Sequence, residues 1–355
     1  MNLVSSKKIL IAPLNWGFGH ATRCVPIINA LIEQGFEPII ASDGNALNYL
    51  KNEFPTLKSY TLPAYDIMYA KYGYFLKLKL FSQTPKIIKA IRQERKMVAE
   101  IIEKEKIKGL ISDNRFGVYS RDIPTVYITH QVQVLSGLTT FLTSKLHQKQ
   151  LFKYNEVWIP DVKKTPRLSG KLTTFNESTI NTKFIGVLSR FKREEKAIQN
   201  YKYDVLVLLS GIELQRNILE KKLVIELDKT DKKILFVRGL LNPTTKLKNT
   251  QTMKFVDFLN QTELIKALNK SELVIARSGY STIMDLAVLQ KKAFFIPTPG
   301  QTEQEYLAQH LNDLKISPFA KQSNFKIELL DKITNYSGFE TKYQFNSENL
   351  FEVFE

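Results

Sequence analysis

The sequence predicts an α/β protein built from two Rossmann-like, doubly wound domains with a cleft between them. Short apolar runs rich in β-branched residues alternate with helical stretches of ten or more residues, which is the pattern of parallel sheets with crossover helices. The alternation stops at a charged, weakly patterned segment, residues 191–202, and then starts again. The length of 355 residues also suits two domains of about 150–180 residues each.

We therefore expect an N-terminal domain over residues 1–190, a linker over 191–202, a C-terminal domain over 203–340 and a tail over 341–355. Ligands bind at the carboxyl ends of the strands in such sheets, so the loops after the strands are the places to search. The expected strands are 8–13, 37–42, 109–112, 124–129, 184–186, 203–209, 233–238, 273–276 and 293–297. The expected helices are 23–33, 86–106, 214–227, 262–269, 281–289 and 303–313.

Composition excludes several classes of protein. Hydrophobic residues make up 43% and charged residues 24% of the chain, as in ordinary globular proteins. No apolar run approaches the roughly 18–20 residues of a membrane-spanning helix, and the first apolar run is too short for a signal peptide. Cys24 is the only cysteine and the four histidines are scattered, so we expect no disulfide within the chain and no metal site. The expected location is the cytoplasm.

The net charge of +16 points to an anionic partner. Between Lys71 and Lys96 there are eight basic residues and a single acid, Glu94, interleaved with aromatic and aliphatic residues. This mixture suits the headgroup region of an anionic membrane surface. The alternative is an ordinary solvated basic helix. No nucleic-acid recognition motif accompanies the charge, so we do not expect nucleic acid as a partner.

The loop after the strand at 273–276 is a candidate anion site. Gly279 allows the backbone to approach a ligand closely, and Ser278 is placed to cap the next helix, whose first amides attract negative charge. Arg277 adds a forked cation suited to phosphate, and Asp285, about one turn into the helix, suits ribose hydroxyls. The alternative is an ordinary helix cap.

The loop after the first strand contains Gly17, Gly19 and His20. The two glycines permit a tight turn and place His20 at the start of a helix. The helix dipole disfavours the charged imidazolium there, so His20 is poised as a neutral base near pH 7. Asp113 follows a neighbouring strand, where it either assists His20 or caps its own loop.

Residues 274–310 resemble the donor-binding segment of the family-28 glycosyltransferases, especially the branch that completes lipid II with N-acetylglucosamine. The resemblance implies the GT-B fold and a diphosphate held around Arg277–Gly279 and the helix start. Asp285 falls on the ribose-binding acid, where the family usually has Glu. Ser281 and Thr282 at the helix start are implied to contact the nucleotide-sugar. Gln304 and Glu305 fall on the family's paired glutamines, which touch the donor sugar and the ribose.

Other stretches follow the same family frame. Phe258 and Leu259 resemble the segment whose backbone reads the uracil edge. Residues 210–217 take the place of a glycine-rich loop, although only Gly211 remains, with Arg216 on the phosphate-contacting arginine. The first loop resembles the family's Gly-His loop, and residues 123–139 resemble its acceptor side. The implied acceptor-side residues are Asn114, Arg115, His130 and Gln131.

The resemblance implies an inverting transferase that moves a hexosyl or N-acetylhexosaminyl group from a UDP-sugar to an envelope glycan or a lipid-linked acceptor, without an obligatory metal or other cofactor. The basic stretch between Lys71 and Lys96 would add a peripheral location at the inner face of the cytoplasmic membrane. Gly17–Cys24 resembles, in addition, the first loop of UDP-sugar hydrolases of nonulosonic acid synthesis, which give the sugar to water. The basic, aromatic stretch favours the transferase. A basic nucleic-acid-binding protein is a third alternative.

Overall fold

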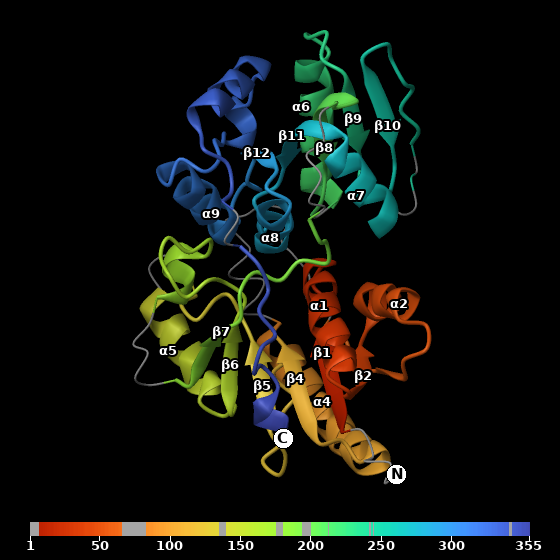
Figure 1. Cartoon of the computed structure of the whole chain (residues 1–355), viewed down its shortest axis with the longest axis vertical. Helices are drawn as coiled ribbons and strands as arrows, with labels where there is room; N and C mark the ends of the chain where they lie inside the picture. Colours follow the sequence, from red (N-terminus) through yellow and green to blue (C-terminus); the bar gives the residue numbers. More distant parts are fainter. Residues whose placement is uncertain are drawn as a thin grey trace. The chain divides into compact units, whose positions relative to one another are not determined.

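The chain is described here by a computed structural model, which covers residues 7–65, 83–134, 140–174, 180–193, 200–211, 213–240, 243, 245–340 and 343–355. It divides into two compact units (Figure 1). The first comprises Met1–Arg190 and Gln344–Glu355, and the second comprises Phe191–Tyr343. The segment expected as a linker therefore begins the second unit, and its residues 194–199 lie outside the described ranges.

The first unit is built on a seven-stranded, wholly parallel sheet in the order β3-β2-β1-β4-β5-β6-β7. The order reverses at β1, between β2 and β4, which is the point where doubly wound sheets bind ligands. The strands are β1 (Lys8–Pro13), β2 (Glu37–Ser42), β3 (Ser59–Thr61), β4 (Gly109–Asp113), β5 (Thr125–Ile128), β6 (Glu156–Ile159) and β7 (Thr182–Phe184). The helices are α1 (Gly19–Glu33), α2 (Gly44–Glu53), α4 (Thr84–Glu105), α5 (Thr140–Leu151) and the short 3₁₀ turns η3 (Gly170–Thr173) and η6 (Glu352–Phe354).

The second unit repeats the design with five parallel strands in the order β10-β9-β8-β11-β12. Its strands are β8 (Tyr203–Leu208), β9 (Ile234–Val237), β10 (Met253–Val256), β11 (Ser271–Ala276) and β12 (Lys292–Phe295). Its helices are α6 (Glu213–Leu227), α7 (Gln261–Asn269), α8 (Tyr280–Val288), α9 (Thr302–Asp313), and the 3₁₀ segments η4 (Gln322–Asn324) and η5 (Ile327–Asn335). The predicted α/β fold class is confirmed for both units.

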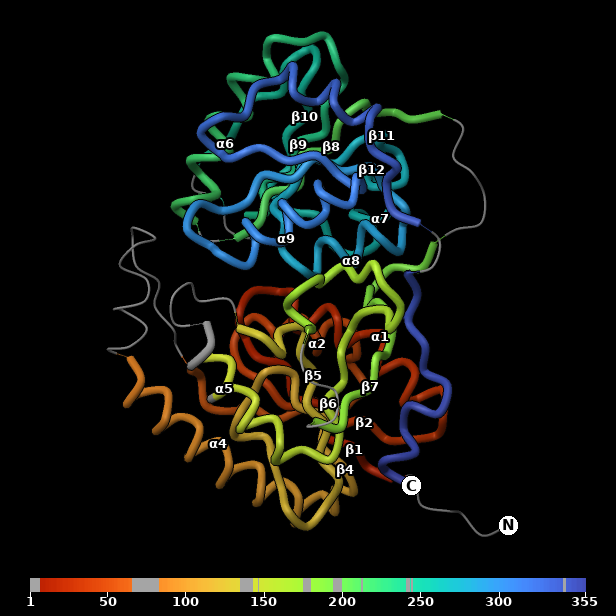
Figure 2. The backbone as a smooth tube through the Cα atoms, turned by 90° about the vertical axis from the view of Figure 1, so that its left-hand side faces the viewer, coloured from red at the N-terminus to blue at the C-terminus, as the bar shows by residue number. Residues whose placement is uncertain are grey.

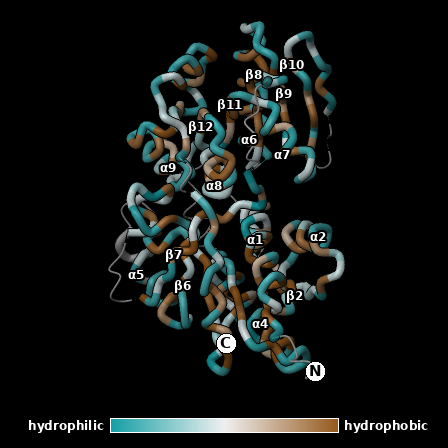
Figure 3. The backbone as a smooth tube through the Cα atoms, viewed as in Figure 1, coloured by the Kyte–Doolittle hydropathy of each residue, from teal (hydrophilic) through white to brown (hydrophobic). Residues whose placement is uncertain are grey.

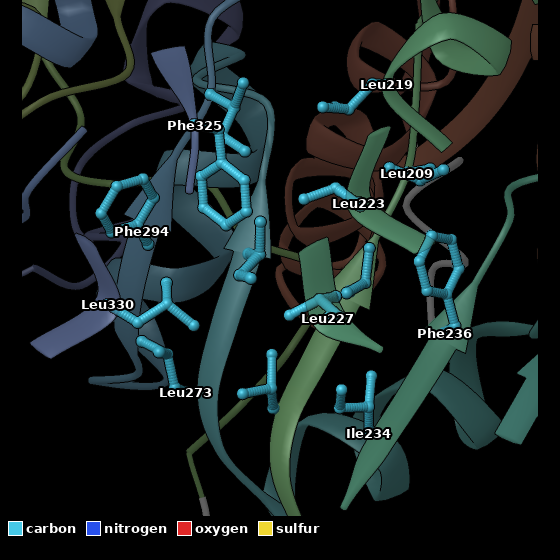
Figure 4. Packing of buried hydrophobic residues seen from close by; sticks show 14 of the residues in the cluster. Leu209, Leu219, Leu223, Leu227, Ile234, Phe236, Leu273, Phe294, Phe325 and Leu330 are labelled. Atoms are coloured by element: carbon cyan, nitrogen blue, oxygen red, sulfur yellow. The ribbon is translucent and has the colours of Figure 1, made fainter. Parts of the chain in front are cut away.

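Buried apolar strands hold each unit together. Parallel strands are covered on both faces, so they read as continuous apolar runs rather than alternating ones, and in Figure 3 the hydrophobic stretches follow the strands. In the second unit, leucines 219, 223 and 227 repeat every fourth residue along α6 and pack with the strands in one core cluster (Figure 4). Phe294 and Phe325 complete it edge to face, with ring centroids 5.5 Å apart.

The end of the chain belongs to the first unit rather than forming a separate tail. Phe345 pairs with Gly186 in an antiparallel bridge, and the buried rings of Phe351 and Phe354 pack against Trp158. Lys7, before β1, donates through Nζ to the carbonyl oxygens of Phe354 at 3.2 Å and of the last residue at 2.6 Å. Figure 2 shows this segment, in blue, running beside the strands of the first unit.

Candidate active site

The loops after β11 and β12 form the phosphate-site candidate of the second unit. Gly279 is the N-cap of α8 in an extended conformation (φ −72°, ψ 140°). No side chain forms a capping hydrogen bond at this end of the helix. The expectation that Ser278 caps the helix is therefore wrong. Ser278 precedes the cap position, and its buried hydroxyl instead donates to the carbonyl oxygen of Gln304 at 2.8 Å. The first-turn amides of a helix have no acceptor within that helix, so those of α8 can donate hydrogen bonds to an anion.

Two glycines leave open space beside their backbones. A Cβ at Gly279 would meet only the Thr282 hydroxyl, 4.0 Å away, and a Cβ at Gly211 would meet nothing within 4 Å. Gly211 also has a left-handed φ of +93°, which other residues adopt at a cost. Backbone at both loops is thus accessible to a ligand at the carboxyl end of the sheet. Ser281, Thr282 and Asp285 are half-buried.

Arg277 is buried and braces several loops. Its Nη1 donates to the carbonyl oxygens of Ile296 and Pro297, each at 3.0 Å. Its Nη2 donates to the Gln215 carbonyl at 2.9 Å and to Gln322 Oε1 at 2.7 Å. All four acceptors are uncharged, and burial lowers the pKa of Arg277 to about 10. The guanidinium therefore holds loops together rather than presenting its terminal nitrogens as an open fork.

Gln304 and Glu305 shape the loop that precedes α9. Gln304 Oε1 accepts from the Thr298 amide at 2.9 Å, and its Nε2 donates to Gln301 Oε1 at 2.6 Å. Glu305 is exposed and accepts from the amide of Gly300 at 3.1 Å. Both predicted sugar contacts thus lie in the first turn of α9, where the Gln304 carbonyl accepts from the Ser278 hydroxyl.

The predicted base-reading residues follow β10. Phe258 is 44% exposed and Leu259 is half-buried. Asn260 then caps α7 in a capping box with Glu263, which fixes where the loop ends. Arg216, in the first turn of α6, donates through Nη1 to the Gly239 carbonyl at 3.1 Å.

Sequence reasoning missed Arg238, which anchors the same loop. This buried arginine forms a bidentate pair with Glu220 and donates through Nη1 to Asp257 Oδ1 at 2.7 Å and to the Thr245 carbonyl at 2.6 Å. Asp257 directly precedes Phe258, so Arg238 positions the start of the segment that was predicted to read the base. An arginine ending a predicted strand was the available signal.

In the first unit, the predicted pair of His20 and Asp113 is brought together. Asp113 ends β4 and is fully buried, and its Oδ1 lies 2.9 Å from His20 Nδ1. His20 is the second residue of α1, which begins four residues earlier than the pattern predicted because Gly17 turns the chain with a φ of +71°. The carboxylate is shared with two residues that sequence reasoning did not assign to the site, Arg23 and Cys24.

Electrostatics keep His20 neutral. Burial lowers the pKa of His20, Asp113 opposes this effect, and Arg23 adds to the lowering. Burial would raise the pKa of Asp113, but Arg23 and His20 together outweigh it and hold that pKa well below its usual range. Asp113 is thus ionised and His20 uncharged near neutral pH, as a general base requires.

The structure does not bring the four predicted acceptor-side residues together at one place. His130, two residues after β5, lies with its Nδ1 3.1 Å from Arg23 Nη1, so it joins the group around His20. Asn114, in a left-handed conformation (φ +60°), accepts from the Tyr127 hydroxyl at 3.0 Å. The amide of half-buried Gln131 donates to its neighbour Thr129, and residues 135–139 of the family match lie outside the described ranges.

Arg115 is not available to an acceptor, contrary to the prediction. It is fully buried, and its guanidinium is bonded to Glu94, to Asp43 Oδ1 at 2.6 Å and to the Pro63 carbonyl at 2.7 Å. Glu94 also accepts from Tyr65 at 2.6 Å. Burying a charge requires such partners, so Arg115 stabilises the fold behind the loop instead of facing a ligand.

Residues 209–351 match the glycosyltransferase family 28 C-terminal domain. This part of the chain belongs to glycosyltransferase family 28. The chain is 25% identical over 316 residues to the UDP-N-acetylglucosamine--N-acetylmuramyl-(pentapeptide) pyrophosphoryl-undecaprenol N-acetylglucosamine transferase of Clostridium botulinum, covering 85% of this chain and 81% of the relative. The transferase of the same name from Clostridium tetani is 26% identical over 303 residues, covering 82% and 78%.

Solved glycosyltransferase structures share the fold of this chain. The kitacinnamycin glycosyltransferase has a TM-score of 0.64 at 12% identity, covering 93% of this chain and 90% of that one. MurG of Acinetobacter baumannii has a TM-score of 0.56 at 15% identity, covering 98% of each. The expected GT-B fold is confirmed, and the protein is a glycosyltransferase. None of the helices within the described ranges has the length and apolarity needed to span a membrane, and the described residues contain no cluster of three metal-ligating side chains.

Proposed function

We propose that this glycosyltransferase moves a hexosyl or N-acetylhexosaminyl group from a UDP-sugar to an acceptor hydroxyl with inversion at the anomeric carbon. The observation that carries the proposal is the 2.9 Å hydrogen bond between His20 and buried Asp113, in a chain whose second unit matches the family 28 C-terminal domain. The curated relatives are named for UDP-N-acetylglucosamine, which supports the donor class.

In this proposal the second unit binds the donor. The first-turn amides of α8, with Ser281 and Thr282, receive the diphosphate beside the open backbone of Gly279. Asp285, one turn further along the helix, receives the ribose hydroxyls. The remaining proposed contacts are Gly211 and Arg216 at the phosphates, Phe258 and Leu259 at the base, and Gln304 and Glu305 at the sugar.

His20 takes the acceptor's proton. When its Nδ1 donates to Asp113, the Nε2 lone pair is available as the base. The acceptor oxygen forms a bond to the anomeric carbon, the bond from that carbon to the diphosphate oxygen breaks, and the hydroxyl proton passes to Nε2. One displacement inverts the anomeric centre. The positive end of the α8 dipole stabilises the leaving UDP, so no metal is needed.

The surface of α4 supports a membrane-bound acceptor. Its first turns expose five basic residues, and the only acid among them, Glu94, is buried and neutralised by Arg115. Ile88 and Met97 are exposed on the same stretch at 44% and 37%. Such a surface suits anionic headgroups, which supports a lipid-linked or envelope acceptor at the inner face of the membrane. The basic residues are Lys86, Lys89, Arg92, Arg95 and Lys96; Lys71, Lys77 and Lys79 lie outside the described residues.

A UDP-sugar hydrolase is the second candidate. The observation that favours it is that Arg23 and Cys24, which complete the hydrolase-like motif, both contact Asp113. Water would then replace the acceptor hydroxyl at His20, with the same bond changes and the same proton transfer.

A panel of UDP-sugars tests both candidates. Each is incubated with the protein with and without a lipid-linked acceptor, and free sugar, UDP and glycosylated acceptor are quantified. We expect UDP release to depend on acceptor, and His20→Ala to lower turnover by about 10²–10⁴-fold while UDP affinity stays within about twofold. Rapid stoichiometric release of sugar and UDP without acceptor would establish the hydrolase instead. Unchanged turnover in His20→Ala would remove this histidine from the chemistry.

A further inference from the structure

Arg23 is the centre of the charged group around His20. It lies one helical turn after His20 on α1, so both side chains share one face of the helix. Only 2% of its surface is exposed, and each of its three nitrogens has a partner in the site. Nε donates to Asp113 Oδ2 at 2.6 Å, Nη2 contacts Asp113 Oδ1 and lies 2.9 Å from His20 Nδ1, and Nη1 lies 3.1 Å from His130 Nδ1.

Three elements bring these groups together. α1 supplies Arg23 and His20, the end of β4 supplies Asp113, and the loop after β5 supplies His130. Because Asp113 pairs in register with Pro13 at the end of β1, the carboxylate is fixed at the centre of the sheet, where the strand order reverses. A buried carboxylate and a buried guanidinium in bidentate contact neutralise each other, and each would be costly alone.

The pairing decides how strongly Asp113 acts on His20. In an isolated carboxylate–imidazole pair, the carboxylate stabilises the imidazolium and makes the histidine a stronger base. Here the guanidinium shares the same carboxylate and lies as close to the imidazole as the carboxylate does. The two full charges therefore largely cancel at the ring.

We propose that Arg23 is a positioning residue that neutralises Asp113 and so keeps His20 uncharged and able to accept a proton at neutral pH. The inference rests on the proposed role of His20 as the base. Arg23 also holds His130 beside the pair, because its Nη1 lies 3.1 Å from His130 Nδ1.

Removal of the Arg23 charge and removal of the Asp113 charge should shift the pKa of His20 in opposite directions. The charged or titratable groups that face it in the described residues are Asp113, Arg23 and His130, and the Cys24 thiol reaches Asp113 at 3.7 Å. In Arg23→Gln, the unneutralised carboxylate should raise the pKa of His20 by about one pH unit or more. In Asp113→Asn, the unopposed guanidinium should lower it. A purely structural role would not reverse sign between the two variants.

Histidine titrations by NMR on the full chain test this without substrate. The chain has only four histidines, so single His→Gln variants assign the resonances. We expect the His20 midpoint to move up in Arg23→Gln, to move down in Asp113→Asn and to remain near the native value in Arg23→Lys, which keeps the charge. Cys24→Ala is the matched control, because it removes a buried contact with the same carboxylate but no charge.

The pH dependence of kcat/KM should shift in the same direction as the pKa of His20 measured by NMR. The acid limb of the kcat/KM profile should move to higher pH in Arg23→Gln, so that activity lost at pH 6 returns as the pH rises. An unmoved His20 midpoint in Arg23→Gln, or shifts of the same sign in both variants, would overturn the proposal. If thermal denaturation shows that one variant does not fold, the direction of shift in the other decides. Turnover of His20→Ala tests the base itself, so the two failures are distinguishable.

Discussion

Two buried arginines in the second unit differ in the charge of their partners. Arg238 is paired with the carboxylates of Glu220 and Asp257, and these hydrogen bonds raise its pKa. Arg277 has only neutral oxygens around its terminal nitrogens, and burial lowers its pKa. A positive charge without a neutralising acid therefore remains just before α8. It acts on a nearby anion through its field, even with its terminal nitrogens occupied.

Arg277→Met should thus weaken the binding of UDP by about tenfold more than the binding of uridine, which has no phosphate. Arg277→Lys, which keeps the charge but not the four-oxygen brace, should weaken both ligands by similar factors. Isothermal titration calorimetry with the two ligands measures the ratio directly. Equal losses of UDP and uridine affinity in Arg277→Met would show that the arginine serves only as a brace.

At the scale of elements, helix α4 carries its basic residues on the exposed face and buries Glu94 on the opposite face. Its buried stripe recurs every three or four residues, at Ala90, Glu94, Val98 and Ile101, and leaves the basic residues outside. Each basic residue near an anionic membrane contributes about 1 kcal/mol, so a change of three of them to glutamine should weaken binding to phosphatidylglycerol vesicles by about 100-fold. The triple variant is Lys86→Gln, Lys89→Gln and Arg92→Gln.

Vesicle co-sedimentation at low and physiological salt measures this effect. The matched control removes three exposed lysines from the second unit, Lys221, Lys229 and Lys232, with the same change in net charge. If both triple variants lose binding equally, the net charge of +16 rather than the α4 face explains the attraction.

Elements with a long, unbroken apolar pattern could be predicted from the sequence alone. The buried run of β1 and the amphipathic α9 were predicted to within a residue or two. Short elements such as β3, which has two half-buried residues and one exposed residue, carry too little pattern to be recognised. The pairing of His20 with Asp113 was anticipated because both follow neighbouring strands. The burial of Arg115 was not, since its partner Glu94 comes from a distant helix.

At the scale of the whole molecule, the first unit draws on both ends of the chain. Its sheet begins with Lys8, and its packing is completed by Phe351 and Phe354, which come after the entire second unit. Phe351 is 1% exposed and lies 5.9 Å from the ring of Trp158 and 5.7 Å from that of Phe36, measured between centroids. The first unit therefore reaches full stability only when Phe351 and Phe354 are packed against it.

Phe351→Ala should destabilise the first unit by about 3–5 kcal/mol, because it leaves a cavity among aromatic rings. Both tryptophans of the chain, Trp16 and Trp158, lie in this unit, so tryptophan fluorescence during urea unfolding reports on it specifically. Phe152→Ala is the control in the same unit: its ring is 57% exposed, and its removal should change stability by no more than about 0.5 kcal/mol. Equal fluorescence midpoints for the two variants would mean that residues 344–355 add nothing to the stability of the first unit.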